Sequence, residues 1–250
     1  MPTLICDLDG VVWLARRAIP GAPEAIARMR EGGWRVLFVT NNSFAPPAEV
    51  EGWLEEIGVP AAGDVRTSAM AAAQLLRPGE RVLAIAGPGV REAVAIAGAH
   101  VVDDGPADAV VVGFDRDFAY EALRRATSAV FGGARLIGTN DDPTYPTPDG
   151  PIPGGGAILA AVSTASGVAA VVAGKPNEPM VELVRRDLAG GERALVVGDR
   201  PSTDGRFARA LGVPFALVLS GVTRPGEAVD PAPDVQARDL AELGALLLES

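Results

Sequence analysis

The chain has 250 residues, of which 48% are hydrophobic and 22% are charged, and its formal net charge is −10. This composition is typical of a folded globular protein, and the length allows one large domain or two modest ones. The negative charge argues against nucleic acid and anionic membranes as partners, although a local positive charge or a bound cation would still permit a small anionic ligand.

Rare residue types exclude several chemistries. With one cysteine and one histidine, an internal disulfide is impossible and a structural zinc site is not expected. A cysteine phosphatase needs the pattern Cys-x5-Arg, but Val12 stands where that arginine would follow Cys6. The opening MPTLICDLDG has no leader pattern, so we expect a cytoplasmic protein. The three tryptophans are interpreted as structural or incidental.

Strand-length apolar runs alternate with helical patterns along the chain, which is typical of a parallel sheet covered by helices. The outer parts of the sequence predict strands at 3–7, 35–40, 193–199 and 215–221 and helices at 22–31, 46–58 and 203–211. The apolar runs are continuous, so these strands should be buried on both faces.

The middle of the chain repeats this alternation. It predicts strands at 81–87, 109–114 and 135–139 and helices at 89–97, 119–131 and 155–165. The long uncharged run at 150–174 is interrupted by proline, glycine and hydroxyl residues, so it predicts a buried helix followed by a strand and no membrane span. We expect an α/β protein: a doubly wound, Rossmann-like parallel-sheet core at 1–77 and 174–250, with an α/β cap domain inserted at 78–173.

LICDLDGVVW places two aspartates, Asp7 and Asp9, at the end of the first predicted strand. In an extended chain, residues i and i+2 point to the same side, so both carboxylates can face one site. Gly10 then permits a sharp backbone turn. Taken alone, the pattern is equally typical of an ordinary turn.

Two later strands also end in polar residues. FVTNNS brings Thr40 and Asn41, whose hydroxyl and backbone N–H groups suit phosphate oxygens, although a helix-capping loop would look the same. VVGDRPSTDG brings Asp199 and Asp204, which favour either a magnesium site or an acidic helix start. Ligands of a doubly wound sheet bind beyond the carboxyl ends of its strands, so we expect these groups at one site.

VVAGKPNEPM contains the only lysine of the chain, Lys175, and every other basic residue is arginine. Chance is one interpretation. The other is a site that requires a compact ammonium and cannot accept the wide planar guanidinium of arginine.

The order Asp-x-Asp-Gly, Thr-Asn-Asn, Lys and Gly-Asp-x-x-x-x-Asp resembles the haloacid dehalogenase (HAD) superfamily of hydrolases. The long interval between Thr40 and Lys175 is similar to that of subfamily IIA, the nitrophenylphosphatase-like branch with a large α/β cap of type C2. AIPGA, TSAM and LVLSGVT also resemble that branch. The resemblance covers almost the whole chain and implies a Mg2+-dependent phosphatase that hydrolyses small phosphomonoesters.

The resemblance also implies a role for each motif residue. Asp7 would be the nucleophile that forms an aspartyl-phosphate intermediate, and Asp9 would be the general acid and base. Mg2+ would be held by the carboxylates of Asp7 and Asp199 and the backbone carbonyl of Asp9. Asp204 would orient a metal-bound water or Asp199, and direct binding of the metal by Asp204 stays open as the alternative. The phosphate would be held by Thr40, Asn41 and Lys175.

The loop GTNDDPTYPTPDG (138–150) resembles the substrate-specificity loop of the branch, with Asn140, Asp142 and Tyr145 as candidates to contact the leaving group. An ordinary surface loop is the alternative. The loop has no histidine, which counts against pyridoxal phosphate as the substrate. Glycerol phosphate, phosphoglycolate, a nucleoside monophosphate or a sugar phosphate stay open as substrates, with 4-nitrophenyl phosphate as an artificial one.

Two further possibilities stay open. A phosphometabolite-binding or regulatory protein could keep this fold without turnover, but it should have lost one of the motif aspartates, and all are present. The inserted segment could also provide the surface of a homodimer.

Overall fold

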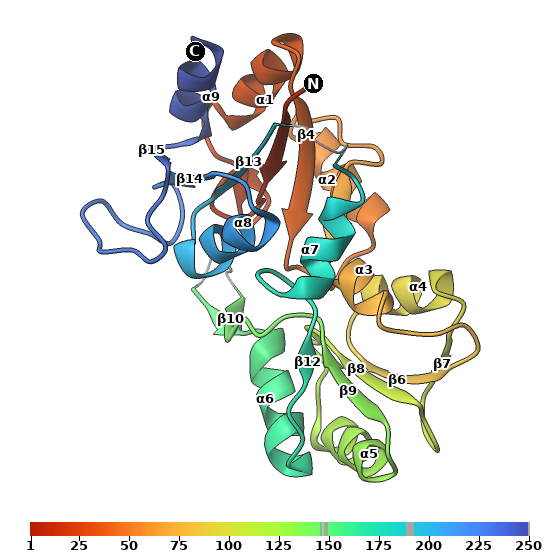
Figure 1. The fold of residues 1–250 in the computed structure, drawn as a ribbon. Helices are drawn as coiled ribbons and strands as arrows, with labels where there is room; N and C mark the ends of the chain where they lie inside the picture. The colour runs from red at the N-terminus through yellow and green to blue at the C-terminus, as the bar shows by residue number, and fades with distance from the viewer. Residues whose placement is uncertain (146, 148–149, 189–192, 250) are drawn as a thin grey trace. The chain divides into compact units, whose positions relative to one another are not determined.

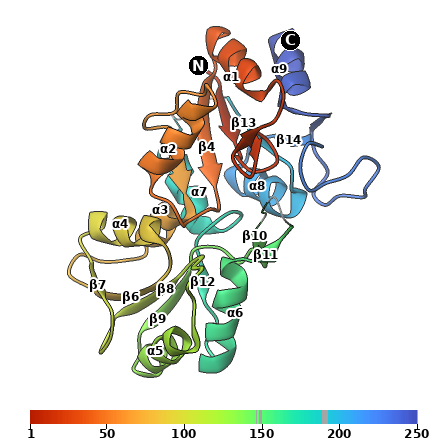
Figure 2. The same cartoon turned by 180° about the vertical axis from the view of Figure 1, so that it is seen from behind.

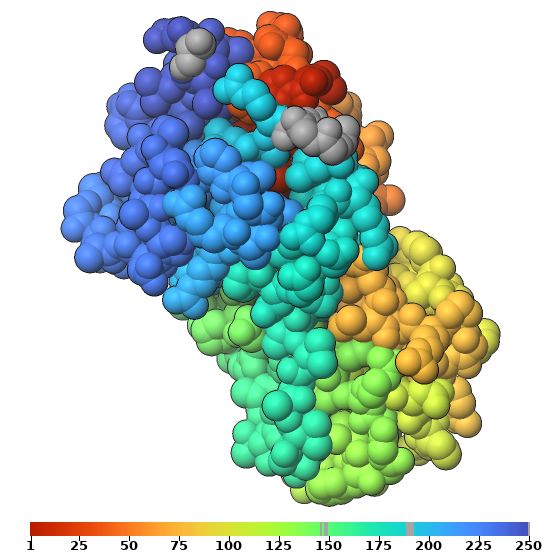
Figure 3. Space-filling model, in the orientation of Figure 1, coloured from red at the N-terminus to blue at the C-terminus, as the bar shows by residue number. Residues whose placement is uncertain are grey.

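The computed structural model describes residues 1–145, 147, 150–188 and 193–249. The chain forms two compact units (Figure 1): the first contains Met1–Thr40, Ala48–Arg66 and Lys175–Ser250, and the second contains Asn41–Pro47 and Thr67–Gly174. The first unit is therefore assembled from both ends of the sequence, coloured red to orange and cyan to blue in Figure 3, and the second is assembled mainly from the middle.

Among the described residues, the first unit is built on a six-stranded sheet in the order β15-β14-β13-β1-β4-β5. The strands are β1 (Thr3–Cys6), β4 (Arg35–Thr40), β5 (Val65–Thr67), β13 (Ala194–Gly198), β14 (Phe215–Val218) and β15 (Val235–Ala237). β1 pairs in parallel with β4 on one side and with β13 on the other. Every residue of β1 is buried, as expected for a central strand that is covered on both faces.

Helices cover both faces of this sheet. They are α1 (Ala22–Glu31), α2 (Pro47–Glu56), α7 (Glu178–Arg185), α8 (Arg206–Leu211) and α9 (Leu240–Leu248). α1 packs against α9, and α7 packs against α8. α7 and α8 lie over the face turned to the viewer in Figure 1, whereas α2 lies over the face seen in Figure 2. The buried residues of α1 recur at helical spacing (Ala22, Ala25, Ile26 and Met29), which is why this segment forms an amphipathic helix.

In its described part, the second unit contains a parallel five-stranded sheet in the order β12-β9-β8-β6-β7. Its strands are β6 (Arg81–Ile85), β7 (His100–Val102), β8 (Ala109–Val112), β9 (Arg135–Gly138) and β12 (Val171–Val172), and β10 (Thr144–Tyr145) forms a separate antiparallel pair with β11 (Ile152–Pro153). Its helices are α3 (Ser68–Ala73), α4 (Pro88–Ile96), α5 (Tyr120–Phe131) and α6 (Gly155–Ser166). α5 and α6 pack together over β6, β8 and β9 and bury a cluster of aliphatic side chains.

The two parallel sheets with their helices confirm the predicted α/β fold class. The run at 150–174 forms α6 and then the short β12, as expected. The α-helix predicted at 203–211 is shorter in the structure. Pro201–Gly205 form a π-helical turn, and α8 begins only at Arg206. Among the described residues, no helix combines the length and the apolar character that crossing a membrane would require.

Candidate active site

Three strand ends meet at one edge of the first sheet. Asp7 directly follows β1, and its N–H still donates to the carbonyl of Val197 at 3.0 Å. The strands β13 and β4 are the two neighbours of β1 in the sheet. Asp199 directly follows β13, and Thr40 is the last residue of β4. Because these strands are parallel, their carboxyl ends lie at the same edge, where the strand order changes direction around β1.

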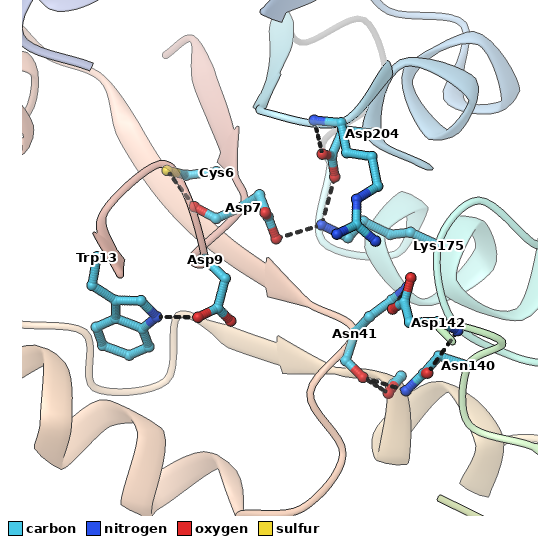
Figure 4. Close-up of polar contacts among 11 residues, drawn as sticks. Cys6, Asp7, Asp9, Trp13, Asn41, Asn140, Asp142, Lys175 and Asp204 are labelled. Carbon is cyan, nitrogen blue, oxygen red and sulfur yellow. Dashed lines mark hydrogen bonds and ion pairs between the residues drawn. The ribbon is translucent and has the colours of Figure 1, made fainter. Parts of the chain in front are cut away.

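The only lysine is buried between two of the motif carboxylates. Lys175 Nζ donates to Asp7 Oδ1 at 2.6 Å and to Asp204 Oδ1 at 2.7 Å (Figure 4). The side chain of Lys175 is only 3% exposed. Burial opposes the charge of the ammonium, but Asp204 and Asp7 outweigh this effect and raise the pKa of Lys175 above its ordinary value. Lys175 therefore stays positively charged at neutral pH.

Asp7, Asp199 and Asp204 offer carboxylate oxygens that all lie within 4.8 Å of one another. We call these three residues and Lys175 the acidic cluster. Burial raises the pKa of Asp7 well above its usual range although Lys175 opposes this, and Asp204 and Asp199 add to the rise. Burial likewise raises the pKa of Asp199 to about 6, with a further contribution from Asp204. The three carboxyl groups outnumber the single ammonium, and their hard oxygen donors suit a divalent cation such as Mg2+, which would favour their ionised forms.

The loop after β14 holds Asp199 in place. The N–H of Val222 donates to Asp199 Oδ2 at 2.6 Å, and Thr223 Oγ1 donates to the backbone carbonyl of Asp199 at 2.6 Å. A Cβ atom at Gly10 would lie 2.4 Å from Asp199 Oδ2, and one at Gly221 would lie 2.0 Å from it. The carboxylate fits only because both positions are glycine, so a side chain at either position would displace an oxygen donor that a cation would use.

Asp204 is oriented by the π-helical turn in which it lies. Its N–H donates to the carbonyl of Arg200 at 2.8 Å, and its Oδ2 accepts the N–H of Arg200 at 3.2 Å. These bonds leave Oδ1 directed at Lys175 (Figure 4). The sequence indicated an acidic residue near a helix start, but it gave no sign that this carboxylate contacts the lysine.

Asp9 has a partner that sequence reasoning missed. Trp13 Nε1 donates to Asp9 Oδ1 at 3.1 Å (Figure 4), and Trp13 is almost completely buried. From the sequence, the tryptophans are interpreted as structural or incidental. The available signal was the spacing of four residues between the second motif aspartate and an indole in DGVVW.

The remaining predicted residues come together in the second unit. Asn41 Nδ2 donates to Asp142 Oδ2 at 3.0 Å, and Asn140 Nδ2 donates to the carbonyl of Asn41 at 2.7 Å. The ring of Tyr145 stacks on Phe114 with centroids 4.7 Å apart. Residues 146 and 148–149 of the predicted loop lie outside the described part of the chain.

The sequence matches known family models at both ends. A model described as haloacid dehalogenase-like hydrolase matches residues 4–100, and a second HAD-hydrolase-like model matches residues 172–243. A D-glycerol 3-phosphate phosphatase from Mycobacterium tuberculosis is 41% identical over 92% of this chain, which spans 66% of the length of that relative. Human chronophin is 37% identical over 90% of this chain and 83% of its own length.

Solved structures have the same fold. The magnesium complex of a glycerol phosphate phosphatase from Mycobacterium tuberculosis has a TM-score of 0.88 and 38% identity, covering 96% of this chain and 75% of that one. A p-nitrophenyl phosphatase from Archaeoglobus fulgidus has a TM-score of 0.90 and 29% identity, covering 98% of both chains. The chain belongs to the haloacid dehalogenase-like hydrolases and to their branch of nitrophenylphosphatase-like phosphatases.

Proposed function

We propose that this protein is a Mg2+-dependent phosphatase that hydrolyses small phosphomonoesters through an aspartyl-phosphate on Asp7. The observation that carries the proposal is the buried contact of 2.6 Å between Lys175 Nζ and Asp7 Oδ1, beside the carboxylates of Asp199 and Asp204. A carboxylate that attacks a phosphate dianion needs positive charge close by, and the acidic cluster provides both a fixed ammonium and oxygen donors for a cation.

Asp7 and Lys175 act together on the phosphoryl group. An oxygen of Asp7 attacks phosphorus, and the ammonium of Lys175 offsets the repulsion between the two anions. The hydroxyl of Thr40 and the N–H of Asn41 hold phosphoryl oxygens as charge spreads over them in the transition state. Asp204 keeps Lys175 oriented through their contact of 2.7 Å. A wide guanidinium could not occupy this buried position, which explains why the residue is lysine.

Asp9 transfers the protons. As the bond between phosphorus and the leaving-group oxygen breaks, Asp9 gives its proton to that oxygen and the free alcohol forms. The resulting carboxylate then takes a proton from the water that attacks phosphorus, and cleavage of the aspartyl-phosphate regenerates Asp7.

The residues that would hold Mg2+ are Asp7 and Asp199 through their carboxylates and Asp9 through its backbone carbonyl. When bound, Mg2+ would supply positive charge that stabilises the phosphoryl oxygens. The close packing of the Asp199 carboxylate against Gly10 and Gly221, which fixes the position of its oxygen donors, supports this assignment, as does the magnesium complex of the mycobacterial glycerol phosphate phosphatase.

For the substrate, we propose a small phosphorylated alcohol, with glycerol phosphate as the first candidate. The proposal is supported by the 41% identity to a D-glycerol 3-phosphate phosphatase. The assignment of 78–173 as a cap domain stays a prediction, as do the roles of Asn140, Asp142 and Tyr145 at the leaving group. A loss of discrimination between phosphomonoesters in Asp142→Ala, with 4-nitrophenyl phosphate turnover retained, would support the leaving-group role.

Phosphate release tests the proposal directly. We expect the wild-type protein to release phosphate from 4-nitrophenyl phosphate and glycerol 3-phosphate with Mg2+ and to stop when EDTA is added. Asp7→Asn serves as the control for contaminating phosphatases. If no phosphomonoester of a broad panel is hydrolysed with Mg2+ but some bind, the chain is a phosphometabolite-binding protein and the proposal is wrong.

A further inference from the structure

We propose that Trp13 is a positioning residue for proton transfer: its indole N–H holds the carboxyl group of Asp9 in the orientation from which Asp9 protonates the leaving group. Trp13 Nε1 lies 3.1 Å from Asp9 Oδ1, and the tryptophan is 3% exposed. The inference rests on the acid–base role proposed for Asp9.

Backbone hydrogen bonds that do not involve the side chain of Asp9 place residue 13 beside residue 9. The N–H groups of Val12 and Trp13 both donate to the carbonyl of Leu8, at 2.9 and 3.2 Å, and the N–H of Gly10 donates to the carbonyl of Trp13 at 2.8 Å. This tight turn brings residue 13 back beside residue 9. Trp13 also begins β2 (Trp13–Leu14), which pairs antiparallel with β3 (Arg17–Ala18). The indole donor is therefore in place before any substrate binds.

The contact limits how the carboxyl group of Asp9 can turn. Oδ1 accepts the indole N–H, which restricts rotation of the group, and we assign the transferred proton to Oδ2. In the first step, the bond between Asp7 and phosphorus forms, the bond between phosphorus and the leaving oxygen breaks, and the proton on Oδ2 passes to that oxygen. Asp9 is then a carboxylate, and the indole still donates to Oδ1 while Oδ2 takes a proton from water. A carboxyl group free to rotate would spend less time in the reactive orientation.

Two substrates that differ in their leaving groups separate this role from a structural one. The alkoxide that leaves glycerol 3-phosphate is strongly basic and requires a proton, whereas 4-nitrophenolate departs without one. For Trp13→Phe, which removes the N–H, we expect kcat/KM for glycerol 3-phosphate to fall roughly 10- to 100-fold. For 4-nitrophenyl phosphate we expect a change of less than about 3-fold. Both substrates form the same aspartyl-phosphate on Asp7. Because kcat/KM reports the steps up to departure of the leaving group, the later hydrolysis of this intermediate does not hide the difference between the two substrates.

A double-mutant cycle shows whether Trp13 acts through Asp9. In an Asp9→Asn background, Trp13→Phe should cause little further loss with glycerol 3-phosphate, because the acid that it orients is already absent. Trp34→Phe is the matched control, since it makes the same change at a half-buried tryptophan of the first unit outside the site. It should leave the ratio of the two substrates unchanged.

Three results would overturn the inference: an equal loss with both substrates, a gain with glycerol 3-phosphate, or additive losses in the cycle. If Trp13→Phe does not fold, site-specific replacement of Trp13 by benzothienylalanine keeps the bicyclic ring and removes only the donor, and the same criteria apply. Failure of the proposed function is distinguishable, because the wild-type protein would then release no phosphate from either substrate with Mg2+.

Discussion

The two units each contain a buried polar network, and the two networks are built from different groups. In the first unit, the acidic cluster brings three carboxylates and one ammonium together. In the second unit, the network consists mainly of neutral groups: Asn140 and Ser68 donate to the carbonyl of Asn41, and Thr139 donates to Ser43 at 2.9 Å. We call this second set the amide network.

The difference indicates what each network does. Neutral amides and hydroxyls that hydrogen-bond to one another cost little free energy to bury, and their hydrogen bonds fix the shape of a loop. Buried charges cost much more, and replacing them with apolar groups is often stabilising. A cluster of carboxylates with raised pKa values, such as Asp7 and Asp199, is therefore retained for chemistry rather than for stability.

We expect the largest difference in turnover when the same substitution, aspartate to asparagine, is made in each of the two units. Asp7→Asn should reduce turnover of 4-nitrophenyl phosphate by about 10⁴-fold or more, because it removes the nucleophile. It should also leave the metal-free protein folded and at least as stable, since a destabilised buried charge is removed. Asp142→Asn is the matched variant in the second unit, where Asp142 accepts a hydrogen bond from Asn41 of the amide network, and we expect it to retain most of this activity. A comparable loss of activity in both variants would contradict the inference that the acidic cluster serves catalysis and the amide network serves structure.

Replacing lysine by arginine tests whether the acidic cluster requires a compact ammonium or only a positive charge. Lys175→Arg should lower kcat by at least ~100-fold, the effect of losing one preorganised contact to the transition state. The reverse exchange, Arg124→Lys, changes an exposed ion pair with Glu121 in the second unit and should have no effect on kcat. Turnover near that of the wild type in Lys175→Arg would show that positive charge alone is sufficient.

Two glycine substitutions compare the acidic cluster with the aliphatic core of the second unit. In Gly221→Ala, the new Cβ would lie 2.0 Å from Asp199 Oδ2, so the carboxylate must move. We expect the Mg2+ concentration for half-maximal activity to rise about 10-fold or more. In Gly138→Ala, the nearest atoms to the new Cβ belong to the buried side chain of Leu159, the closest at 2.2 Å, so the strain falls on the aliphatic core of the second unit. That variant should keep its Mg2+ requirement; a parallel change in both variants would indicate general destabilisation.

The smallest expected effect is the pH dependence of stability without metal. Between about pH 4 and pH 6, folded Asp199 keeps a proton that the unfolded chain has lost, because its pKa is about 6. The free energy of unfolding should therefore fall as pH rises through this window, by about 1 kcal/mol per pH unit. Urea unfolding in EDTA measures this slope, which should decrease in Asp199→Asn. Excess Mg2+ should also reduce the slope, because a cation favours the ionised carboxylates.

The periodic segments of the fold were predictable from the sequence. The helix predicted at 22–31 is α1, and the strand predicted at 35–40 is β4, because long amphipathic or continuous apolar runs carry their own signal. Short elements such as β5 and β7 were missed. They have only three residues each, and their pairing partners, rather than a local pattern, make them strands.

The sequence by itself determined the residue types of the site and their positions at strand ends. Asp7, Asp199 and Lys175 could be named because carboxylates, a lone lysine and strand-ending patterns are local features. Only the tertiary structure decided the contacts: Asp204 against Lys175, Gly221 against Asp199, and Trp13 against Asp9. Such contacts depend on backbone turns and strand pairing that place each side chain to within about an ångström, and residue spacing does not encode that geometry.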